Sequence, residues 1–336
     1  MLASTAAEAG TIGSEPAIVI DAPNGGESWS QRNFYSIRWV SSSDVTDVQI
    51  VLYKEGNPVH TIAASTPSDG SFAWFVPSGL EPGGGYRVWV SSLADPAIYD
   101  ESDGDFSIAP ASQPALAGAL ILDGIDDYAE AADHEELDLA GGSFTVEAWV
   151  NFRDLLWEEV FIKPGAYALH IERTYSYPSW RSCMGIDYPC GVICCTSSSY
   201  LSLGWHHVAL VYDATAGKAL AYYDGTQRCS ATCSANNSDQ PLKVGKGFTG
   251  NALEGAIDEL RLSSTARYTA NFVRPVEPFA CDGSTRALWH FDELDGATVF
   301  HDLCGTTDNV LLGKNGAHSE GIPARRVYLP MMLRLH

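Results

Sequence analysis

The chain has 336 residues, 20 of them basic and 42 acidic, which gives a formal net charge of −22 at pH 7. So acidic a surface repels phosphate backbones and anionic lipid, which disfavours nucleic-acid and membrane-surface binding, but it suits divalent cations. No stretch approaches the roughly 18 consecutive apolar residues of a membrane span, so we expect no transmembrane segment. The length allows two domains with cores of their own.

The first third of the chain predicts a β-sandwich. Short apolar runs alternate with clusters of Gly, Pro, Asn, Asp and Ser, and no long amphipathic helix interrupts them. Between Tyr86 and Val90 every second residue is apolar, so one face of that strand belongs to the core. The predicted strands lie within residues 17–23, 34–40, 45–53, 71–77, 86–93 and 104–110.

A second set of strands follows a short linker. Residues 110–118 are rich in Pro, Ala and Ser, which is typical of a domain boundary. In residues 144–151 apolar and polar residues alternate with a period of two. The fold class is therefore all-β. The second set of strands lies within residues 119–132, 143–152, 167–173, 204–213, 218–225, 241–245, 256–264 and 287–302.

All cysteines lie in the second half of the chain, and four of them fall within the stretch "CMGIDYPCGVICC". The spacings do not form the paired C-x2-C motifs of zinc sites, and no Cys-x-x-Cys-His motif exists for haem attachment. A redox dithiol would open a helix, and this loop-like stretch does not predict one. Disulfides in an oxidising, extracellular compartment are the remaining interpretation. The eight residues are Cys183, Cys190, Cys194, Cys195, Cys229, Cys233, Cys281 and Cys304.

The spacing of the cysteines suggests part of their pairing. Cys281 and Cys304 lie far from the other six and are favoured as partners of each other. The other six would then connect the stretch 183–195 to the loop that contains "CSATC". Cys194 and Cys195 are adjacent and point to opposite faces of an extended segment, so we expect them to take different partners.

Residues 16–109 resemble a known surface domain. The segments "APNGGESW", "YSIRW", "FAWFVP" and "GDFSI" resemble the immunoglobulin-like domain named for yeast cell-wall glucan synthesis and Ser/Thr-rich anchored proteins. In that family the domain is usually an extracellular spacer. The resemblance implies an immunoglobulin-like β-sandwich here.

Residues 119–273 resemble a laminin-G-like jelly roll of the concanavalin A type. The segments that carry this resemblance are "LDGIDDYAEAADHEELDL", "SFTVEAWV", "GWHHVALVYD", "AYYDG" and "GAIDELRLSSTARYTANF". It implies secretion and a binding, adhesive or structural role more often than catalysis. The cysteine-rich insertion departs from the family. The predicted organisation is an extended tail (1–15), an Ig-like sandwich (16–109), a linker (110–118), a jelly roll (119–320) with an insertion at 183–233, and a second tail (321–336).

The resemblance also implies where calcium would bind. In the family, calcium when present is held near the loops that carry "DGIDD" and "AIDEL", because clustered carboxylate and carbonyl oxygens suit this ion. The alternative is that these acidic residues only cap turns through hydrogen bonds to nearby N–H groups. The matching residues are Asp123, Asp126, Asp127, Asp258 and Glu259.

Catalytic motifs are missing from the sequence. Glycan-cleaving enzymes of this fold need facing carboxylates, commonly written as Glu-x-Asp-x-x-Glu on one strand, and no segment has that spacing. No G-x-S-x-G elbow or phosphate loop is present, so we expect neither an enzyme nor a nucleotide cofactor. His206 and His207 lie on opposite faces of one strand, so they cannot both bind one metal ion.

Aromatic residues beside the cysteine insertion form a candidate sugar platform. Tyr175, Tyr177 and Trp180 lie close together in the sequence, and aromatic faces stack on the C–H surfaces of sugars. The alternative is that these rings fill a sandwich core or a contact between subunits.

Two functions follow. The first is an extracellular structural protein that assembles with itself into a filament or coat, in which a terminal tail completes the open sheet edge of a neighbouring copy and disulfides stiffen the assembly. The second is a lectin-like adhesion module that binds a glycan or a cell-surface protein through the jelly-roll loops, with calcium as a cofactor. Calcium-dependent ligand binding by a monomer would favour the second.

Overall fold

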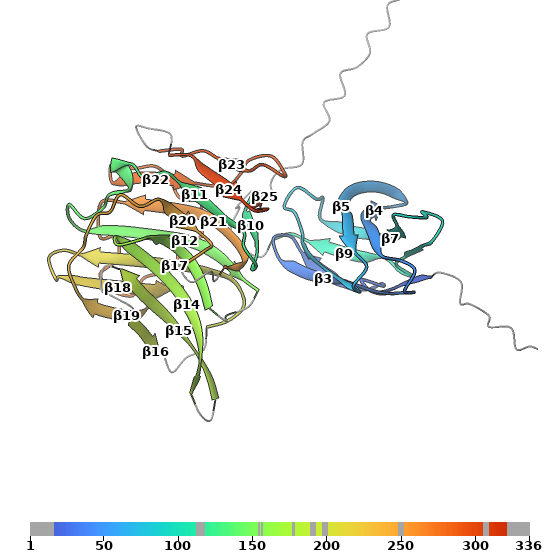
Figure 1. Cartoon of the computed structure of the whole chain (residues 1–336), viewed down its shortest axis with the longest axis horizontal. Helices are drawn as coiled ribbons and strands as arrows, with labels where there is room; N and C mark the ends of the chain where they lie inside the picture. The colour runs from blue at the N-terminus through green and yellow to red at the C-terminus, as the bar shows by residue number, and fades with distance from the viewer. Residues whose placement is uncertain are drawn as a thin grey trace, which may run out of the picture. The chain divides into compact units, whose positions relative to one another are not determined.

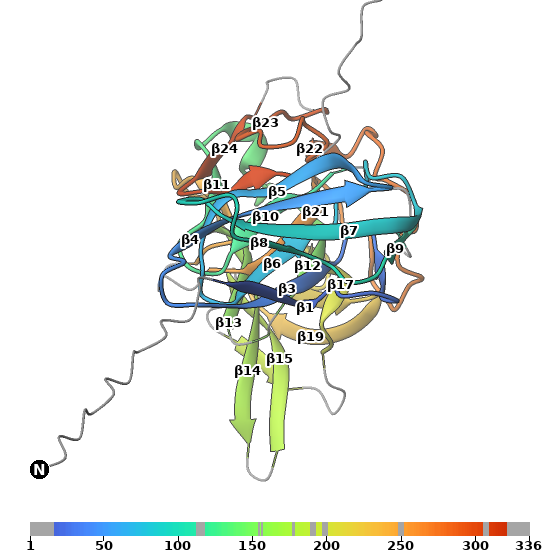
Figure 2. The same cartoon turned by 90° about the vertical axis from the view of Figure 1, so that its right-hand side faces the viewer.

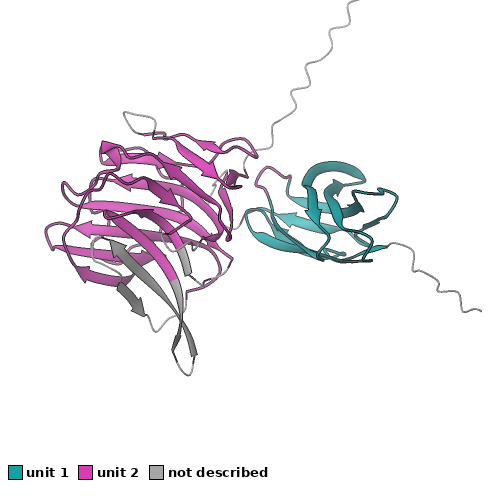
Figure 3. Ribbon diagram, viewed as in Figure 1, with its two compact units in different colours: residues 1–76, 81–110 teal, residues 77–80, 111–336 magenta. Residues whose placement is uncertain are grey.

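The computed structural model describes residues 17–111, 118–153, 155, 157–176, 179–188, 193–196, 201–247, 252–304 and 309–320. For residues 157, 158, 172–176, 179–188 and 193–196 it describes the backbone alone. The chain forms two compact units, one of residues 1–76 and 81–110 and the other of residues 77–80 and 111–336 (Figure 3). Each unit is built from β-strands, and the described residues contain no α-helix, which confirms the all-β prediction.

The first unit contains two sheets (Figure 1). The smaller sheet has the order β1-β3-β6, with β1 (Ile18–Ala22), β3 (Phe34–Ser41) and β6 (Ser71–Phe75). The larger sheet has the order β2-β9-β7-β4-β5, with β2 (Ser28–Ser30), β9 (Phe106–Ala109), β7 (Gly83–Ser92), β4 (Asp47–Lys54) and β5 (Asn57–Pro67), and β8 (Tyr99–Glu101) pairs with β7. In Figure 2 strands β5, β4 and β7 lie side by side.

The core of the first unit follows from alternation along its strands. Tyr86, Val88 and Val90 on β7 are buried, as predicted, while Arg87 and Trp89 lie on the outer face. Strand β5 was not predicted from the sequence. Its segment has proline near both ends and pairs with β4 through several register shifts. In a strand that is paired so irregularly at a sheet edge, apolar and polar residues do not alternate regularly, so the sequence pattern does not indicate a strand.

The second unit contains two large sheets (Figure 1). The first, sheet C, has the order β19-β18-β17-β12-β21-β10-β25, with β22 paired to β21. The second, sheet D, has the order β16-β15-β14-β13-β20-β11-β24-β23. The strands of sheet C are β10 (Leu120–Asp123), β12 (Phe144–Phe152), β17 (Gly204–Asp213), β18 (Lys218–Tyr223), β19 (Thr226–Thr232), β21 (Glu254–Ser263), β22 (Thr285–Trp289) and β25 (His318–Ser319).

Sheet D packs on the inner face of sheet C through one hydrophobic core, which includes Val146, Leu210 and Ile257 from sheet C and Leu169 and Val244 from sheet D. A 3-10 turn, η1 (Glu135–Leu137), lies between strands β11 and β12. The strands of sheet D are β11 (Tyr128–Ala131), β13 (Trp157–Lys163), β14 (Tyr167–Ser176), β15 (Ser179–Tyr188), β16 (Ile193–Thr196), β20 (Leu242–Val244), β23 (Val299–Phe300) and β24 (Leu311–Lys314).

Strand β12 is buried on both faces, which alternation alone does not predict. All nine residues from Phe144 to Phe152 are buried. One face packs in the core, whereas the segment 264–284 lies over the other, with Tyr268 and Phe272 packed near Val211 and Tyr222. The polar side chains of this outer face are therefore enclosed by protein.

The cysteine-rich stretch extends sheet D, so the expectation of a loop was wrong. Its backbone forms β15 and β16, the last two strands on one edge of the sheet, and β16 approaches β19 at the edge of sheet C. Cys229 on β19 lies in the core, and both Cys229 and Cys233 are disulfide-bonded. Cys281 is bonded to Cys304, the pairing favoured from the sequence. The side chains of Cys183, Cys190, Cys194 and Cys195 lie outside the described residues.

Candidate functional site

Three of the predicted calcium ligands meet in the turn between β10 and β11. Carboxylate oxygens of Asp123, Asp126 and Asp127 all lie within 4.8 Å of one another. Gly124 has a φ of +78°, which lets the chain turn directly after Asp123. The Asp123 carboxylate accepts the Ile125 backbone N–H at 2.8 Å and thereby fixes the turn. Turn capping and a shared oxygen cluster therefore coexist, although the sequence analysis treated them as alternatives.

Asp127 is the unusual member of this aspartate turn. Its side chain is only 5% exposed, and its Oδ1 atom is buried without a hydrogen-bond partner. Burial raises the pKa of this carboxyl to about 6, and the negative charges of Asp123 and Asp126 add to the effect. A buried oxygen that repels two neighbouring carboxylates is stabilised by a cation. The residues present therefore fit a calcium ion, which takes six to eight oxygen ligands.

Residues that follow β20 and β24 shape the rest of the aspartate turn. Lys246 Nζ and Asn315 Nδ2 donate to the Asp126 carbonyl oxygen at 3.1 and 3.0 Å. Gly316 has a φ of +138°, and a Cβ atom at this position would lie 2.7 Å from Asp127 Oδ1. A larger residue at this position would therefore press against the buried Asp127 carboxylate. The turn thus brings carboxylate oxygens close together, and it leaves little space for a large side chain at Gly316.

Asp258 and Glu259 do not join this cluster, and that part of the prediction was wrong. The segment "AIDEL" lies within β21, not in a loop, and Asp123 is paired with Glu254 on that strand. At about 3.3 Å per residue, Asp258 lies about 13 Å further along. Glu259 is instead bound by His290 Nδ1 at 2.5 Å and by the Phe279 N–H at 2.6 Å.

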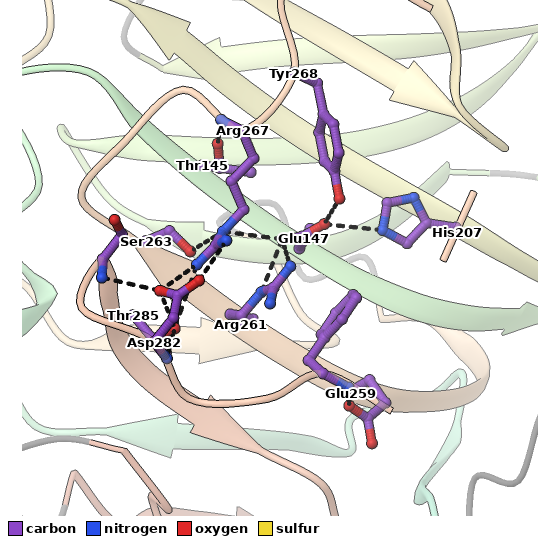
Figure 4. Close-up of polar contacts among 12 residues, drawn as sticks. Thr145, Glu147, His207, Glu259, Arg261, Ser263, Arg267, Tyr268, Asp282 and Thr285 are labelled. Carbon is purple, nitrogen blue, oxygen red and sulfur yellow. Dashed lines mark hydrogen bonds and ion pairs between the residues drawn. The ribbon is translucent and has the colours of Figure 1, made fainter. Parts of the chain in front are cut away.

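A second cluster of polar residues lies under the segment 264–284, around Glu147 on β12 (Figure 4). Glu147 is completely buried, and Arg261 donates to its Oε1 atom from Nε and Nη2 at 2.9 and 2.6 Å. His207 Nε2 lies 3.1 Å from Oε2, and the Tyr268 hydroxyl donates to the same oxygen at 2.8 Å. Burial alone would raise the pKa of Glu147, but the hydrogen bonds and charges of His207 and Arg261 lower it to about 2.

The covering segment is held by a further ion pair. Arg267 donates from Nη1 and Nη2 to the two carboxylate oxygens of Asp282, both at 2.9 Å, and from Nε to Ser263 Oγ at 2.7 Å (Figure 4). The Tyr268 and Phe272 rings stack at 3.5 Å between centroids. The residues around Glu147 therefore close the outer face of sheet C.

The Glu147 cluster was not predicted from the sequence. Glu147 and Arg261 each occupy a polar position in an alternating strand, which normally indicates a solvent-exposed face. Only the apolar residues of "TARYTANF" could have indicated that a later segment covers that face. His206 and His207 do point to opposite faces, since His206 Nδ1 contacts Asp224 at 2.7 Å, whereas His207 contacts Glu147.

The predicted sugar platform is only partly described. The backbones of Tyr175 and Trp180 are paired directly in the β14–β15 hairpin, but their side chains lie outside the described residues, as does all of Tyr177. The tails 1–15 and 321–336, which carried the expectation of self-assembly, also lie outside them. A separate cavity of about 400 Å³ lies at the other end of β11, with His134 and Asn309 in its lining. That volume suits a small ligand.

Family comparisons agree with the two units. Residues 22–107 match the Kre9/KNH-like N-terminal Ig-like domain, and residues 123–271 match the concanavalin A-like lectin/glucanases superfamily in its laminin-G form. The chain therefore contains an Ig-like domain followed by a laminin-G-like jelly roll of the concanavalin A type. No curated protein matches the chain. Among the described residues, no helix is long and apolar enough to span a membrane.

Several solved structures are similar in fold at low identity. A candidate carbohydrate-binding protein from Bacteroides ovatus ATCC 8483 is 16% identical, with 92% of this chain and 99% of that chain covered and a TM-score of 0.49. A heptameric SAP-like pentraxin from Limulus polyphemus is 12% identical, with 62% and 96% covered and a TM-score of 0.40. Domains LG4-5 of the mouse laminin alpha1 chain are 12% identical, with 75% and 70% covered and a TM-score of 0.33.

Proposed function

We propose that this protein is a non-enzymatic extracellular adhesion module whose laminin-G-like unit binds a glycan or a cell-surface protein with calcium held by Asp123, Asp126 and Asp127. The observation that carries the proposal is the buried Asp127 Oδ1 atom, which has no hydrogen-bond partner and lies beside two other carboxylates. A divalent cation would satisfy this oxygen and neutralise the repulsion. The match to the concanavalin A-like lectin/glucanases superfamily supports a carbohydrate as the ligand class.

The absence of catalysis is part of this proposal. Cleavage of a glycan needs two carboxylates that reach the substrate from opposite sides. On the outer face of sheet C, Glu147 and Asp258 are fully buried, and Glu147 is already bound by Arg261, His207 and Tyr268. Carboxylates held in this way support a structural role.

An extracellular location fits the cysteine chemistry. Cys281–Cys304 is a disulfide, and Cys229 and Cys233 are disulfide-bonded as well. Disulfides persist in oxidising compartments outside the cytosol. Self-assembly by strand exchange stays a separate prediction, because it depends on the two tails.

Calorimetry and a glycan array test this function. Titration of calcium into the purified protein should give one binding event per chain, and Asp127→Asn should abolish it. Asp44→Asn changes an exposed acidic residue of the other unit and should leave calcium binding unchanged. Array binding that requires calcium would support the proposal, whereas a protein that binds no calcium would refute the cofactor.

A further inference from the structure

The larger sheet of the Ig-like unit carries an aromatic row on its outer face. Because Val48, Ile50 and Leu52 of β4 point into the core, Tyr53 points outward, as does Trp89 on β7. Tyr99 on β8 lies on the same side and is 49% exposed. We call Tyr53, Trp89 and Tyr99 the aromatic row.

The strand register sets the direction of the aromatic row. Tyr53 is paired with Arg87, two residues from Trp89, and Tyr99 is paired with Ser91, two residues from Trp89 on the other side. The three rings therefore run diagonally across three neighbouring strands. The Trp89 and Tyr99 rings stack with centroids 3.9 Å apart, and the Tyr53 centroid lies 5.7 Å from that of Trp89.

The polar groups on this face remain open. The outer face has four groups without a hydrogen-bond partner among the described residues. These are the Trp89 indole N–H, the hydroxyls of Tyr53 and Tyr99, and the side-chain amide of Gln49.

The charged groups on this face limit the class of ligand that it can bind. Arg87, the cation beside the rings, is already paired with Asp105 at 2.6 Å and with Glu101 at 3.5 Å. Among the described residues, this face therefore offers no free positive charge to a nucleic acid or another anion, although bases also stack on aromatic rings. A second copy of the chain carries the same charge of −22 and is repelled. A neutral molecule with C–H faces and many hydroxyls matches both the rings and the open polar groups.

We propose that the aromatic row, together with Gln49, is a second ligand-binding surface that holds a neutral oligosaccharide. Ring faces contact sugar C–H groups, while the open amide, indole and hydroxyl groups exchange hydrogen bonds with the sugar hydroxyls. This surface lies in the Ig-like unit and needs no calcium. The Ig-like unit is then a binding domain in its own right, and two sites on one chain would raise avidity for a polymeric glycan.

Affinity electrophoresis of the full chain tests the proposal. Gels would contain xylan, mannan or hydroxyethyl cellulose, each with a chelator present so that the aspartate turn cannot contribute. The wild-type protein should be retarded by at least one of these neutral polymers. Tyr99→Ala and Trp89→Ala should each weaken binding about tenfold, and Gln49→Ala about threefold.

Controls separate lost binding from lost folding. Val40→Ala truncates a 70% exposed side chain on the other sheet of the same unit and should bind as wild type does. Trp89→Phe retains a ring and should recover part of the affinity. Should Trp89→Ala fail to fold, the exposed Tyr99 variant still decides the question.

Two outcomes would overturn the proposal. One is equal retardation of folded Tyr99→Ala and wild type, and the other is no retardation by any neutral polymer with the chelator present. Retardation that appears only with calcium would also overturn it, while it supports the function proposed for the aspartate turn.

Discussion

Two of the carboxylate clusters in the laminin-G-like unit, around Glu147 and in the aspartate turn, differ in what surrounds them. Around Glu147, the chain itself supplies the positive charge through Arg261, and the pKa of Glu147 falls to about 2. In the aspartate turn, Asp127 faces two further carboxylates, and its pKa rises to about 6. A carboxylate that is paired with a cation of the chain stabilises the fold, whereas the proposed calcium ion would supply the opposite charge for Asp127.

The largest effect is expected from Glu147→Ala. This change leaves Arg261 buried without its counter-charge, so the free energy of unfolding should fall by about 3–5 kcal/mol. Urea denaturation measures this loss. Glu277→Ala removes an exposed carboxylate from the same covering segment and should change stability by no more than about 0.5 kcal/mol. If Glu147→Ala lowers the free energy of unfolding by less than about 1 kcal/mol, the cluster does not stabilise the fold.

Acid should weaken the Glu147 cluster selectively. The pKa of Glu147 lies below its ordinary value of 4.5, so its stabilising contribution is complete above pH 4.5 and disappears as the pH falls to about 2. Integrated over this window, the loss amounts to about 3 kcal/mol. Denaturation curves between pH 5 and pH 2 should show a steeper decline for wild type than for Glu147→Gln. An equal decline in the stability of wild type and Glu147→Gln would contradict the lowered pKa of Glu147.

Calcium should act on the other cluster. At a hundredfold excess over its dissociation constant, calcium should stabilise the folded protein by about 2.7 kcal/mol. Thermal unfolding with calcium and with a chelator measures this difference. Glu147→Gln should retain the calcium response and Asp127→Asn should lose it. The reverse result would mean that the roles of the two clusters are exchanged.

The smallest effect concerns Asp127 without calcium. Because its folded pKa is raised from 3.8 to about 6, the charged carboxylate destabilises the folded state above pH 6, and this cost vanishes below pH 3.8. The full shift corresponds to about 3 kcal/mol, but the amide of Asn also loses hydration on burial, so Asp127→Asn should stabilise the calcium-free protein by about 1–2 kcal/mol at pH 7 and have little effect at pH 4. Chemical denaturation at the two pH values tests this, and a destabilised variant at pH 7 would contradict it.

Local patterns predicted much of the fold. Alternation identified strands such as β7 and β12, and the isolated positions of Cys281 and Cys304 suggested their pairing. The compact motif "DGIDD" brought three aspartates together, because a tight turn keeps near neighbours in sequence close in space.

These local patterns could not predict how segments that are distant in the sequence pack together. Alternation shows that two faces of a strand differ, but it does not show that residues 264–284 return to cover the polar face and enclose Glu147. It also could not place Asp258 relative to Asp123, because that distance depends on the register of β10 with β21. Strand β5 was missed because its pairing with β4 is irregular.

The difference between the two clusters can be measured directly by carbon-13 NMR of the side-chain carboxyl groups during a pH titration, with Asp127→Asn used to assign the Asp127 signal. In the absence of calcium, Asp127 should titrate near pH 6, and saturating calcium should move its titration to lower pH while the Glu147 signal stays unchanged down to pH 3. An Asp127 signal that titrates at an ordinary pH near 4, or that does not respond to calcium, would contradict the account.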